Sequence, residues 1–346
     1  SAIDPYQTIA GLSKYDYLFG EDAGNKFFAY RPSMIPNKDL GWEISRTANF
    51  GVDFGLWNNR ISGYIEGYIT KTSDLLMERT LPFFTGFSKV WQNIGKTANK
   101  GIELNIQANT LKTKSFSWET TVTFARNWNK ITELLGGGDI RNNSWFIGKP
   151  LQVHYNYEMI GVWQLGEEKE AQKYGAIPGD IKVKDQNNDG SIGELDKVIL
   201  GQKDPKIIAS LLNSFRFGAF DASINLNMNF GSLIHPNTYA SLITRDGLRW
   251  MPSNFKYWTP DNPTNEYTRA DKLSGYDPFA GTGGYMKGDY IKIQDITLGY
   301  DFSKIMPKNW KILRARLYAQ VRNLGYIYKA CKNDVSPEAP DFDYNI

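Results

Sequence analysis

The chain has 346 residues, a formal net charge of +3 and a single cysteine. The small net charge argues against a nucleic-acid partner, and one cysteine excludes a disulfide framework or a zinc site built from cysteines. No apolar run approaches the ~20 residues of a transmembrane helix, whereas a transmembrane β-strand needs only ~9–11 residues that are apolar at alternate positions.

Alternating apolar and polar residues run along most of the chain. Successive side chains of a strand point to opposite faces, so this pattern predicts strands with one apolar and one polar face. We predict nine long strands, in chain order at residues 41–57, 61–79, 97–109, 115–130, 148–164, 205–217, 219–231, 285–303 and 312–329.

The predicted strand at 219–231 shows this pattern most clearly. From residue 222 onward its even-numbered residues are apolar, and its odd-numbered residues include a column of three amides, Asn225, Asn227 and Asn229. Because the same alternation recurs in the other strands, it predicts a large sheet whose two faces contact different solvents.

The predicted connections differ in length. Short periplasmic turns and long outside loops are the layout of an outer-membrane barrel. The sequence therefore predicts an all-β fold, an antiparallel transmembrane β-barrel with its long loops on one rim. Short connections are predicted near 58–60, 110–114, 217–219 and 304–311, and long ones at 80–96, 131–147, 165–204 and 232–284.

A soluble β-sandwich is the alternative architecture, because its strands also alternate apolar and polar residues. Two features favour the barrel. The predicted strands often exceed a dozen residues, whereas globular strands typically have about 5–6. Their polar face is also rich in Asn, Ser, Thr, Tyr and Gly and poor in charge in several strands, which is unusual for a face in bulk water.

Residues 185–196 match a twelve-residue calcium loop. Asp185, Asn187 and Asp189 occupy loop positions one, three and five, Ser191 would offer its backbone carbonyl, and Asp196 stands where an EF-hand has glutamate. The flanking residues look like strands, so we predict a structural Ca²⁺ that stiffens a loop in a β context. An Asn/Asp/Gly-rich turn that needs no ion remains the alternative.

The sequence shows no nucleophile–base pair, phosphate loop or cluster for metal catalysis. The two histidines, His154 and His235, lie far apart in the chain and are predicted to be ordinary surface or loop residues. A glycosidase would need two placed carboxylates, and the sequence nominates no such pair. We therefore expect that the protein is not an enzyme and has no catalytic cofactor.

Several segments, taken in order, resemble the C-terminal half of a SusC/RagA-type TonB-dependent outer-membrane transporter. Each segment is weak evidence alone, and their order across residues 37–329 makes the resemblance fairly specific. Two examples are Asn-Lys-Gly-Ile-Glu-Leu at 99–104 and Pro-Gly-Asp-Ile-Lys-Val-Lys-Asp at 178–185. The full set is 37–43, 49–55, 58–63, 68–76, 93–95, 99–104, 178–185, 198–201, 257–263, 290–300 and 316–324.

The resemblance implies a barrel of roughly 22 strands with a plugged lumen. The nine predicted strands are under half of that number, so residues 1–346 are expected to form a partial barrel without the plug domain or the final strand. The calcium-type loop, with its flanks at 180–201, is expected inside an extracellular loop.

The resemblance also implies a function. Family members import glycans, oligosaccharides or peptides across the outer membrane of Gram-negative Bacteroidota. The expected partners are a SusD-like surface lipoprotein, outer-membrane lipid, and TonB, reached through a segment absent from this chain. Trp91 and Trp145, expected in loops, and the lumen amides Asn225, Asn227 and Asn229 are the predicted substrate contacts. The alternative function is a soluble carbohydrate-binding or adhesive β-sandwich protein with a structural calcium.

Overall fold

The computed structural model describes residues 11–18, 26–32, 35–87, 89–243, 255–269, 279–303, 305–307, 312, 314–332 and 335–338. The chain divides into two compact units. The first comprises Ser1–Phe50, Gly67–Gly101 and Asn127–Leu151, and the second comprises Gly51–Glu66, Ile102–Arg126 and Gln152–Ile346.

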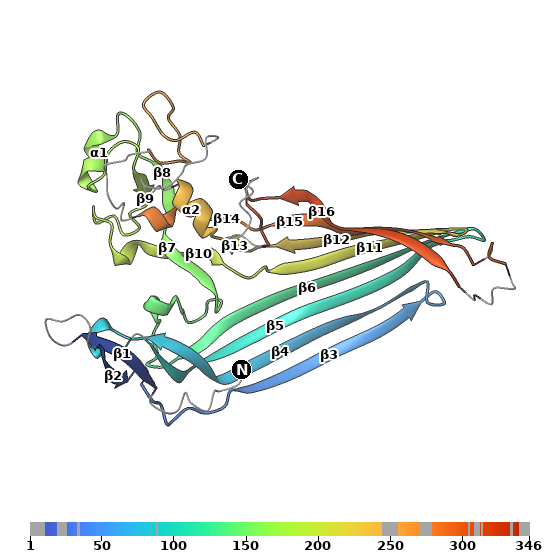
Figure 1. Ribbon diagram of the computed structural model, residues 1–346, viewed down its shortest axis with the longest axis horizontal. Coiled ribbons are helices and arrows are strands. Elements are labelled where there is room, and N and C mark those ends of the chain that lie inside the picture. The colour runs from blue at the N-terminus through green and yellow to red at the C-terminus, as the bar shows by residue number, and fades with distance from the viewer. Residues whose placement is uncertain are drawn as a thin grey trace. The chain divides into compact units, whose positions relative to one another are not determined.

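Eight long strands form one sheet and follow each other in chain order across it (Figure 1). Every long strand is thus a neighbour of the next one in the sequence, which is the connectivity of a meander. The long strands are β3 (Ile44–Leu56), β4 (Ile61–Thr80), β5 (Lys89–Lys112), β6 (Phe116–Leu134), β11 (Ile207–Phe217), β12 (Phe220–Phe230), β15 (Tyr290–Asp301) and β16 (Arg316–Lys329).

The remaining elements are short and lie outside this sheet. They pair as β1 with β2, β7 with β10, β8 with β9, and β13 with β14. They are β1 (Leu12–Leu18), β2 (Lys26–Pro32), β7 (Val153–Tyr157), β8 (Met159–Val162), β9 (Ile181–Val183), β10 (Lys197–Gln202), β13 (Leu233–Ile234), β14 (Met286–Lys287), α1 (Glu168–Lys173), α2 (Asn237–Ile243) and the 3-10 turns Phe83–Thr85, Arg141–Asn143, Glu194–Asp196 and Ala280–Thr282.

The prediction of a strand at 148–164 was wrong, and the sheet has eight long strands where nine were predicted. This segment is divided between β7 and β8, which pair with β10 and β9 instead of joining the large sheet. Gly161 has a φ of +146°, a backbone conformation that side chains rarely adopt, and it interrupts the ladder where β8 meets β9. The hairpin β1–β2 lies before residue 41 and was not predicted.

Without a long strand at 148–164, the connections between consecutive long strands alternate strictly between shorter and longer ones. The predicted loops 131–147 and 165–204 become one long connection, 135–206, and a second long connection spans 231–289. In an antiparallel meander every second connection lies on the same rim, as these two long connections do. The predicted long loop at 80–96 is only the short connection 81–88, because β5 already begins at Lys89. Part of the predicted turn at 304–311 lies outside the described residues.

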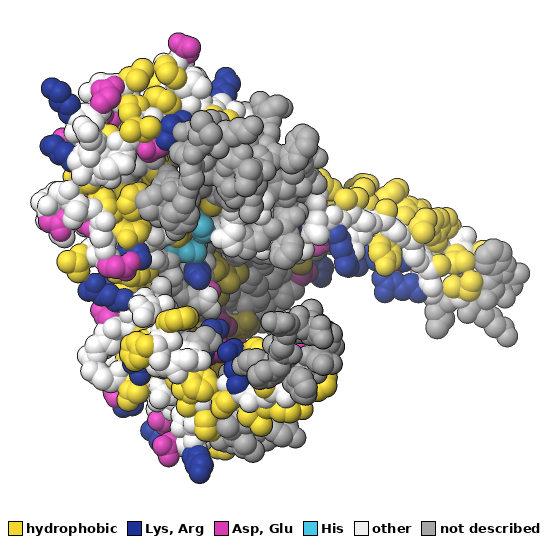
Figure 2. All heavy atoms as spheres, turned by 60° about the vertical axis from the view of Figure 1, so that its left-hand side comes forward, with side chains coloured by type: hydrophobic (Ala, Val, Ile, Leu, Met, Phe, Trp, Pro, Cys, Tyr) yellow, Lys and Arg dark blue, Asp and Glu magenta, His cyan; other side chains and the backbone are white. Residues whose placement is uncertain are grey.

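The register of the last strands confirms the two predicted faces. Ala222 of β12 lies opposite Phe215 of β11 and Leu298 of β15, and both neighbours are apolar. One residue later, Ser223 lies opposite Ser214 and Thr297, which are polar. Figure 2 shows hydrophobic side chains along one face of this sheet end and Lys and Arg along the other.

The apolar face is exposed to solvent. Phe217 is 63% exposed, Leu298 62% and Leu317 69%. A sandwich would cover such a face with a second sheet, but the described strands form no second layer on it. Moving one such side chain out of water is worth about 1.5–3 kcal/mol, so a whole exposed face requires an apolar environment other than protein. The β-sandwich alternative is therefore not supported.

Buried residues lie away from the middle of the eight-stranded sheet, which we call the wall. In the second unit the fully buried side chains lie mostly in the two long connections, for example Val162, Trp163 and Ile181 in the first and Tyr239 in the second. No residue of β11 or β12 is in the buried class. The wall is held by its backbone ladder, whereas conventional cores lie in the connections.

A glycine in β4 tests how closely the strands approach. A Cβ at Gly63 would overlap the backbone oxygen of Asn105, whereas a Cβ at Gly67 would lie 3.9 Å from Gly101 O. We expect Gly63→Ala to lower the unfolding free energy of the full-length protein by about 1–3 kcal/mol, the usual cost of overpacking. Gly67→Ala, the matched control, should stay within about 0.5 kcal/mol. Urea unfolding followed by circular dichroism measures both, and equal effects would contradict the close approach at Gly63.

Candidate functional site

The predicted amide column lies on the polar face of the sheet and is partly engaged by the neighbouring strand β15. Asn225 Nδ2 donates to Asp295 Oδ2 at 3.2 Å, and Asn229 Nδ2 donates to the Tyr290 hydroxyl at 2.8 Å. Asn227 makes no side-chain hydrogen bond with any described residue. The column is thus a fixed polar wall in which Asn227 keeps its amide available.

A buried lysine lies on the same face. Lys292 of β15 is 9% exposed, and its Nζ lies 2.5 Å from Glu338 Oε2. The same carboxylate accepts a hydrogen bond from Tyr326 at 2.8 Å and one from Tyr290 at 3.4 Å. Lys292 is the buried partner and Glu338 the more exposed one, and these three contacts attach the segment after β16 to the sheet.

Charged residues also line the polar face near the short turns. Arg316 of β16 reaches across β15 to Asp221 of β12, with Nε 2.9 Å from Asp221 Oδ1. The strand between them contributes Gly299, where a Cβ would lie 2.7 Å from both partners. The glycine therefore makes room for an ion pair that spans three strands.

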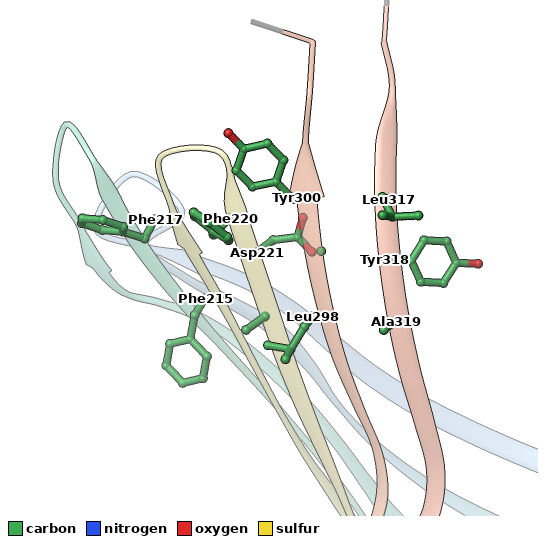
Figure 3. A pocket seen from close by; sticks show the side chains of 11 residues that line it. Phe215, Phe217, Phe220, Asp221, Leu298, Tyr300, Leu317, Tyr318 and Ala319 are labelled. Atoms are coloured by element: carbon green, nitrogen blue, oxygen red, sulfur yellow. The ribbon is translucent and has the colours of Figure 1, made fainter. Parts of the chain in front are cut away.

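An open hollow of about 560 Å³ lies on the opposite, apolar face. Figure 3 shows its side chains coming from the four neighbouring strands β11, β12, β15 and β16. They include Phe215, Phe217, Phe220 and Leu298. The lining also includes Tyr300, Tyr318 and Asp221, and the carboxylate of Asp221 is already paired with Arg316. Because the rest of the lining is apolar, the hollow fits the lipid-facing side of a barrel better than a substrate site.

Both histidines meet around one tyrosine, although the sequence predicted two unrelated residues. The ring of Tyr285 lies 5.1 Å from that of His154 and 4.2 Å from that of His235, between centroids. His154 Nε2 is 2.9 Å from Leu233 O, and His235 Nε2 is 2.9 Å from Gly283 O. Figure 2 shows histidine side chains in cyan beside hydrophobic ones. The cluster joins the connection 135–206 to the connection 231–289.

A cavity of about 490 Å³ lies beside this cluster. Its walls come from both long connections and from the segment after β16. An ion pair crosses between two of these parts, because Lys332 Nζ lies 2.7 Å from Glu266 Oε1. Burial raises the pKa of Glu266, but hydrogen bonds from Lys332 and the neighbouring tyrosines outweigh it and lower that pKa, so the carboxylate is ionised at neutral pH.

The acidic loop folds around its own carboxylates. Asp185 accepts hydrogen bonds from the backbone of Asn188 and Gly190, and Asp189 accepts from Ser191. Asp196 is 1% exposed and accepts from two backbone N–H groups. Within the described residues, no group of three or more His, Cys, Asp or Glu side chains is arranged to hold a metal ion.

The two predicted tryptophan contacts belong to the first unit, whereas the amide column belongs to the second. Trp91 lies within β5, so its prediction as a loop residue was wrong. The segment around it contains Gln92, Asn93 and Gly95, which read as a loop by composition but continue the strand. Trp145 does lie in a connection, where it is half-buried and bridges to Ile140.

The family described as "TonB dependent receptor-like, beta-barrel" matches residues 13–324, which is most of the chain. The chain belongs to this family.

Two curated relatives in the TonB-dependent receptor family illustrate the relationship. TonB-dependent receptor SusC of Bacteroides thetaiotaomicron is 29% identical over 322 residues, covering 89% of this chain and 30% of the relative. TonB-dependent receptor P26 of Formosa agariphila is 28% identical over 322 residues, covering 87% of this chain and 31% of the relative. The chain thus spans about a third of the length of these relatives.

Solved structures show the same fold. The RagAB peptide importer in its "closed-closed" state superposes with a TM-score of 0.75 at 21% identity, covering 98% of this chain and 37% of that chain. Another structure of the RagAB peptide transporter gives 0.74 at 21% identity, covering 97% and 37%. The predicted resemblance and the predicted all-β antiparallel fold are thereby confirmed. In the described residues the TonB-dependent receptor sheet is not closed, and β16 and β3 are its edges.

The family consists of receptors and transporters and is not a class of enzymes. The described residues contain no helix long and apolar enough to cross a membrane. The sequence did not predict the two ion pairs formed by Lys292 with Glu338 and by Glu266 with Lys332. Lys292 was the one signal in the sequence, because a charged residue inside the alternating run 290–300 needs a partner of opposite charge.

The His154 cluster predicts a pH dependence. Burial, together with repulsion from Lys203 and His235, lowers the pKa of His154 to about 4, against the hydrogen bond with Leu233. A histidine in an unfolded segment has a pKa near 6.5. Below that pH the locally unfolded state therefore binds a proton at His154, whereas the folded state does not until the pH approaches about 4. The free energy by which folding around His154 is favoured is therefore fully present above about pH 6.5 and decreases as the pH falls toward about 4.

Hydrogen exchange of β7 and β13, corrected for intrinsic rates, measures this effect in the full-length protein. We expect protection to fall between pH 7 and pH 5 in the wild type, and to fall much less in His154→Gln, which cannot titrate. An equal loss of protection in both proteins would contradict the role of His154.

Proposed function

We propose that this chain forms part of the barrel wall of an outer-membrane, TonB-dependent nutrient importer in a Gram-negative bacterium. The observation that supports this most strongly is the sheet with one exposed apolar face and one polar face. A bilayer core has no water to satisfy backbone groups, so spanning strands must be paired in a sheet and apolar on the lipid side. The eight-stranded wall meets both conditions between its edges.

The edges support a larger barrel. Every residue of β3 except one is exposed, and most of β16 is exposed on both faces. An unpaired strand edge is a site of association or aggregation. In the proposed importer these edges would pair with further strands of a barrel of roughly 22 strands, the size at which the lumen holds a plug.

Import would proceed along the polar face. The wall amides Asn225, Asn227 and Asn229 would offer hydrogen bonds to a glycan, oligosaccharide or peptide, and Trp91 and Trp145 would contribute aromatic surface. A SusD-like surface lipoprotein is the proposed partner, since SusC is among the relatives, and TonB would supply the energy. The alternative of a soluble carbohydrate-binding protein would leave the apolar face without cover.

Detergent dependence tests the membrane assignment. We expect the full-length protein to sediment with the outer-membrane fraction and to elute as a single species only in detergent, because the apolar face needs a lipid-like environment. Size-exclusion chromatography with and without detergent measures this. A single species in buffer without detergent would overturn the proposal. Uptake of labelled oligosaccharides and peptides by cells with and without TonB then tests the energy source.

We also propose a structural Ca²⁺ in the loop 185–196. Its oxygen donors are of the hard type that Ca²⁺ prefers. An ionised carboxylate has about four acceptor sites, so Asp185 retains capacity beside its three hydrogen bonds, which come from Asn188, Gly190 and the Tyr174 hydroxyl. Hydrogen bonds from Ser191 and Asn187 lower the pKa of Asp189, which keeps it ionised. The carboxylates of Asp185, Asp189 and Asp196 are not arranged as a metal-binding group. The proposed ligand set therefore also needs the side-chain oxygen of Asn187 and the backbone carbonyl of Ser191.

Calcium removal tests this loop. We expect the full-length protein to retain one calcium after gel filtration, measured by mass spectrometry of the metal, and to lose it in Asp189→Asn because one anionic ligand is gone. EGTA should speed proteolysis within 185–196. Asp204→Asn, outside the loop, is the control. If the wild type holds no calcium at millimolar concentrations, the turn needs no ion.

A further inference from the structure

The cavity between the long connections has the size and position of a ligand site. Its volume of about 490 Å³ falls in the range of small-ligand pockets, about 300–1,000 Å³. Its walls come from segments that are far apart in the chain: Glu158 and Leu200 from the first connection, Glu266 and Met286 from the second, and Lys332 after β16.

The apolar part of this cavity is aliphatic. Met159, Ile160, Leu200, Leu233 and Met286 all line it. Methionine side chains are flexible and polarizable and adapt to apolar groups of different shape. Such a wall suits a set of related aliphatic or aromatic side chains better than one rigid ligand.

The described lining of the cavity holds only two aromatic residues, Tyr239 and Tyr285. Tyr239 is only 2% exposed. The ring of Tyr285 already has the rings of His154 and His235 as neighbours. The mostly aliphatic lining therefore suits an apolar side chain better than a sugar ring.

The lining of the cavity carries two carboxylates, Glu158 and Glu266, and one ammonium, Lys332. Each carboxylate is paired with a lysine, Glu158 with Lys184 at 3.3 Å and Glu266 with Lys332 at 2.7 Å. Gln186 and Lys184 bond to Oε2 of Glu158, and its Oε1 has no described partner. The Glu266–Lys332 pair is half-exposed, at 40% and 51%, so an incoming cation can compete with Lys332 for the carboxylate.

A hydrogen-bond donor faces the same space. The hydroxyl of Tyr285 accepts a bond from Asn156 at 3.1 Å, and among the described residues nothing accepts its own proton. Burial raises the pKa of Tyr285, so the proton is retained. A carbonyl oxygen of a bound ligand can accept this hydrogen bond.

We propose that this cavity binds a peptide segment in which an apolar side chain stands next to a positively charged group. The apolar side chain lies among Met159, Leu200 and Met286, the cation faces Glu266 and Glu158, and Tyr285 donates to a backbone carbonyl. This assignment rests on the proposed importer function and narrows its substrate class from glycan or peptide to peptide.

Binding of defined probes to the full-length protein in detergent tests the proposal. The probes are Ala-Leu-Lys-Ala, Ala-Leu-Glu-Ala and Ala-Ser-Lys-Ala, together with maltoheptaose. We expect the first peptide to bind about tenfold or more tightly than the other two, because each lacks one of the two required groups. Isothermal titration calorimetry gives the dissociation constants.

Two substitutions at one ion pair should act in opposite directions. Glu266→Gln removes the carboxylate and leaves Lys332 to repel the ligand, so it should weaken Ala-Leu-Lys-Ala by about fivefold or more. Lys332→Gln frees Glu266, so it should strengthen the same peptide. Misfolding would weaken binding in both variants. Glu170→Gln is the matched control, because Glu170 also forms an exposed ion pair, with Lys173 at 2.6 Å, and neither residue lines the cavity.

The outcomes separate the two proposals. Shifts in the same direction, no shift in either variant, no peptide binding by the wild type, or a maltoheptaose affinity that follows the variants in place of the peptide would each overturn the peptide assignment. A variant pair without effect in a protein that still needs detergent and still supports TonB-dependent uptake would overturn the cavity assignment alone. A protein that is monodisperse without detergent would overturn the importer function itself.

Discussion

The structure depends on one constraint, the need of the apolar face for an apolar environment. Leu298 and Leu317 project from neighbouring strands and remain more than half exposed. Lipid can supply that environment only if every backbone group of the wall is already paired. Long paired strands, short turns on one rim and polar residues on the opposite face all follow from this requirement. The same requirement explains why the wall has no buried residues of its own in β11 and β12.

Because the wall is fixed by its ladder, discrimination between ligands in the proposed importer would fall to the connections. The connections 135–206 and 231–289 contain their own buried residues, including Trp163 and Tyr239. They are joined by the histidine pair, and the Glu266–Lys332 ion pair ties the second connection to the segment after β16. A loop that packs like a small domain holds its polar groups in place, which is what a binding cavity requires.

The sequence predicted the wall well because strand alternation is a local property. The apolar and amide columns of β12 could be assigned to faces from period two alone. The segment 148–164 was misassigned because its alternation serves two short ladders, and a period cannot tell a short ladder from a long one. Lys292 and Glu338, or His154 and His235, could not be paired from the sequence, since only the fold brings such distant residues together.

The segment after β16 links the cavity of the connections to the polar wall. Lys332 is paired with Glu266 at the cavity, and Glu338 is paired with the buried Lys292 on the polar wall. Both side chains of the Glu266–Lys332 pair are half-exposed, so this pair is worth little, whereas the Lys292 side chain of the other pair is 11% exposed and would lose its charge partner without Glu338. In the proposed importer, a peptide that displaces Lys332 would therefore break the weaker of these two contacts and leave the Lys292–Glu338 contact in place.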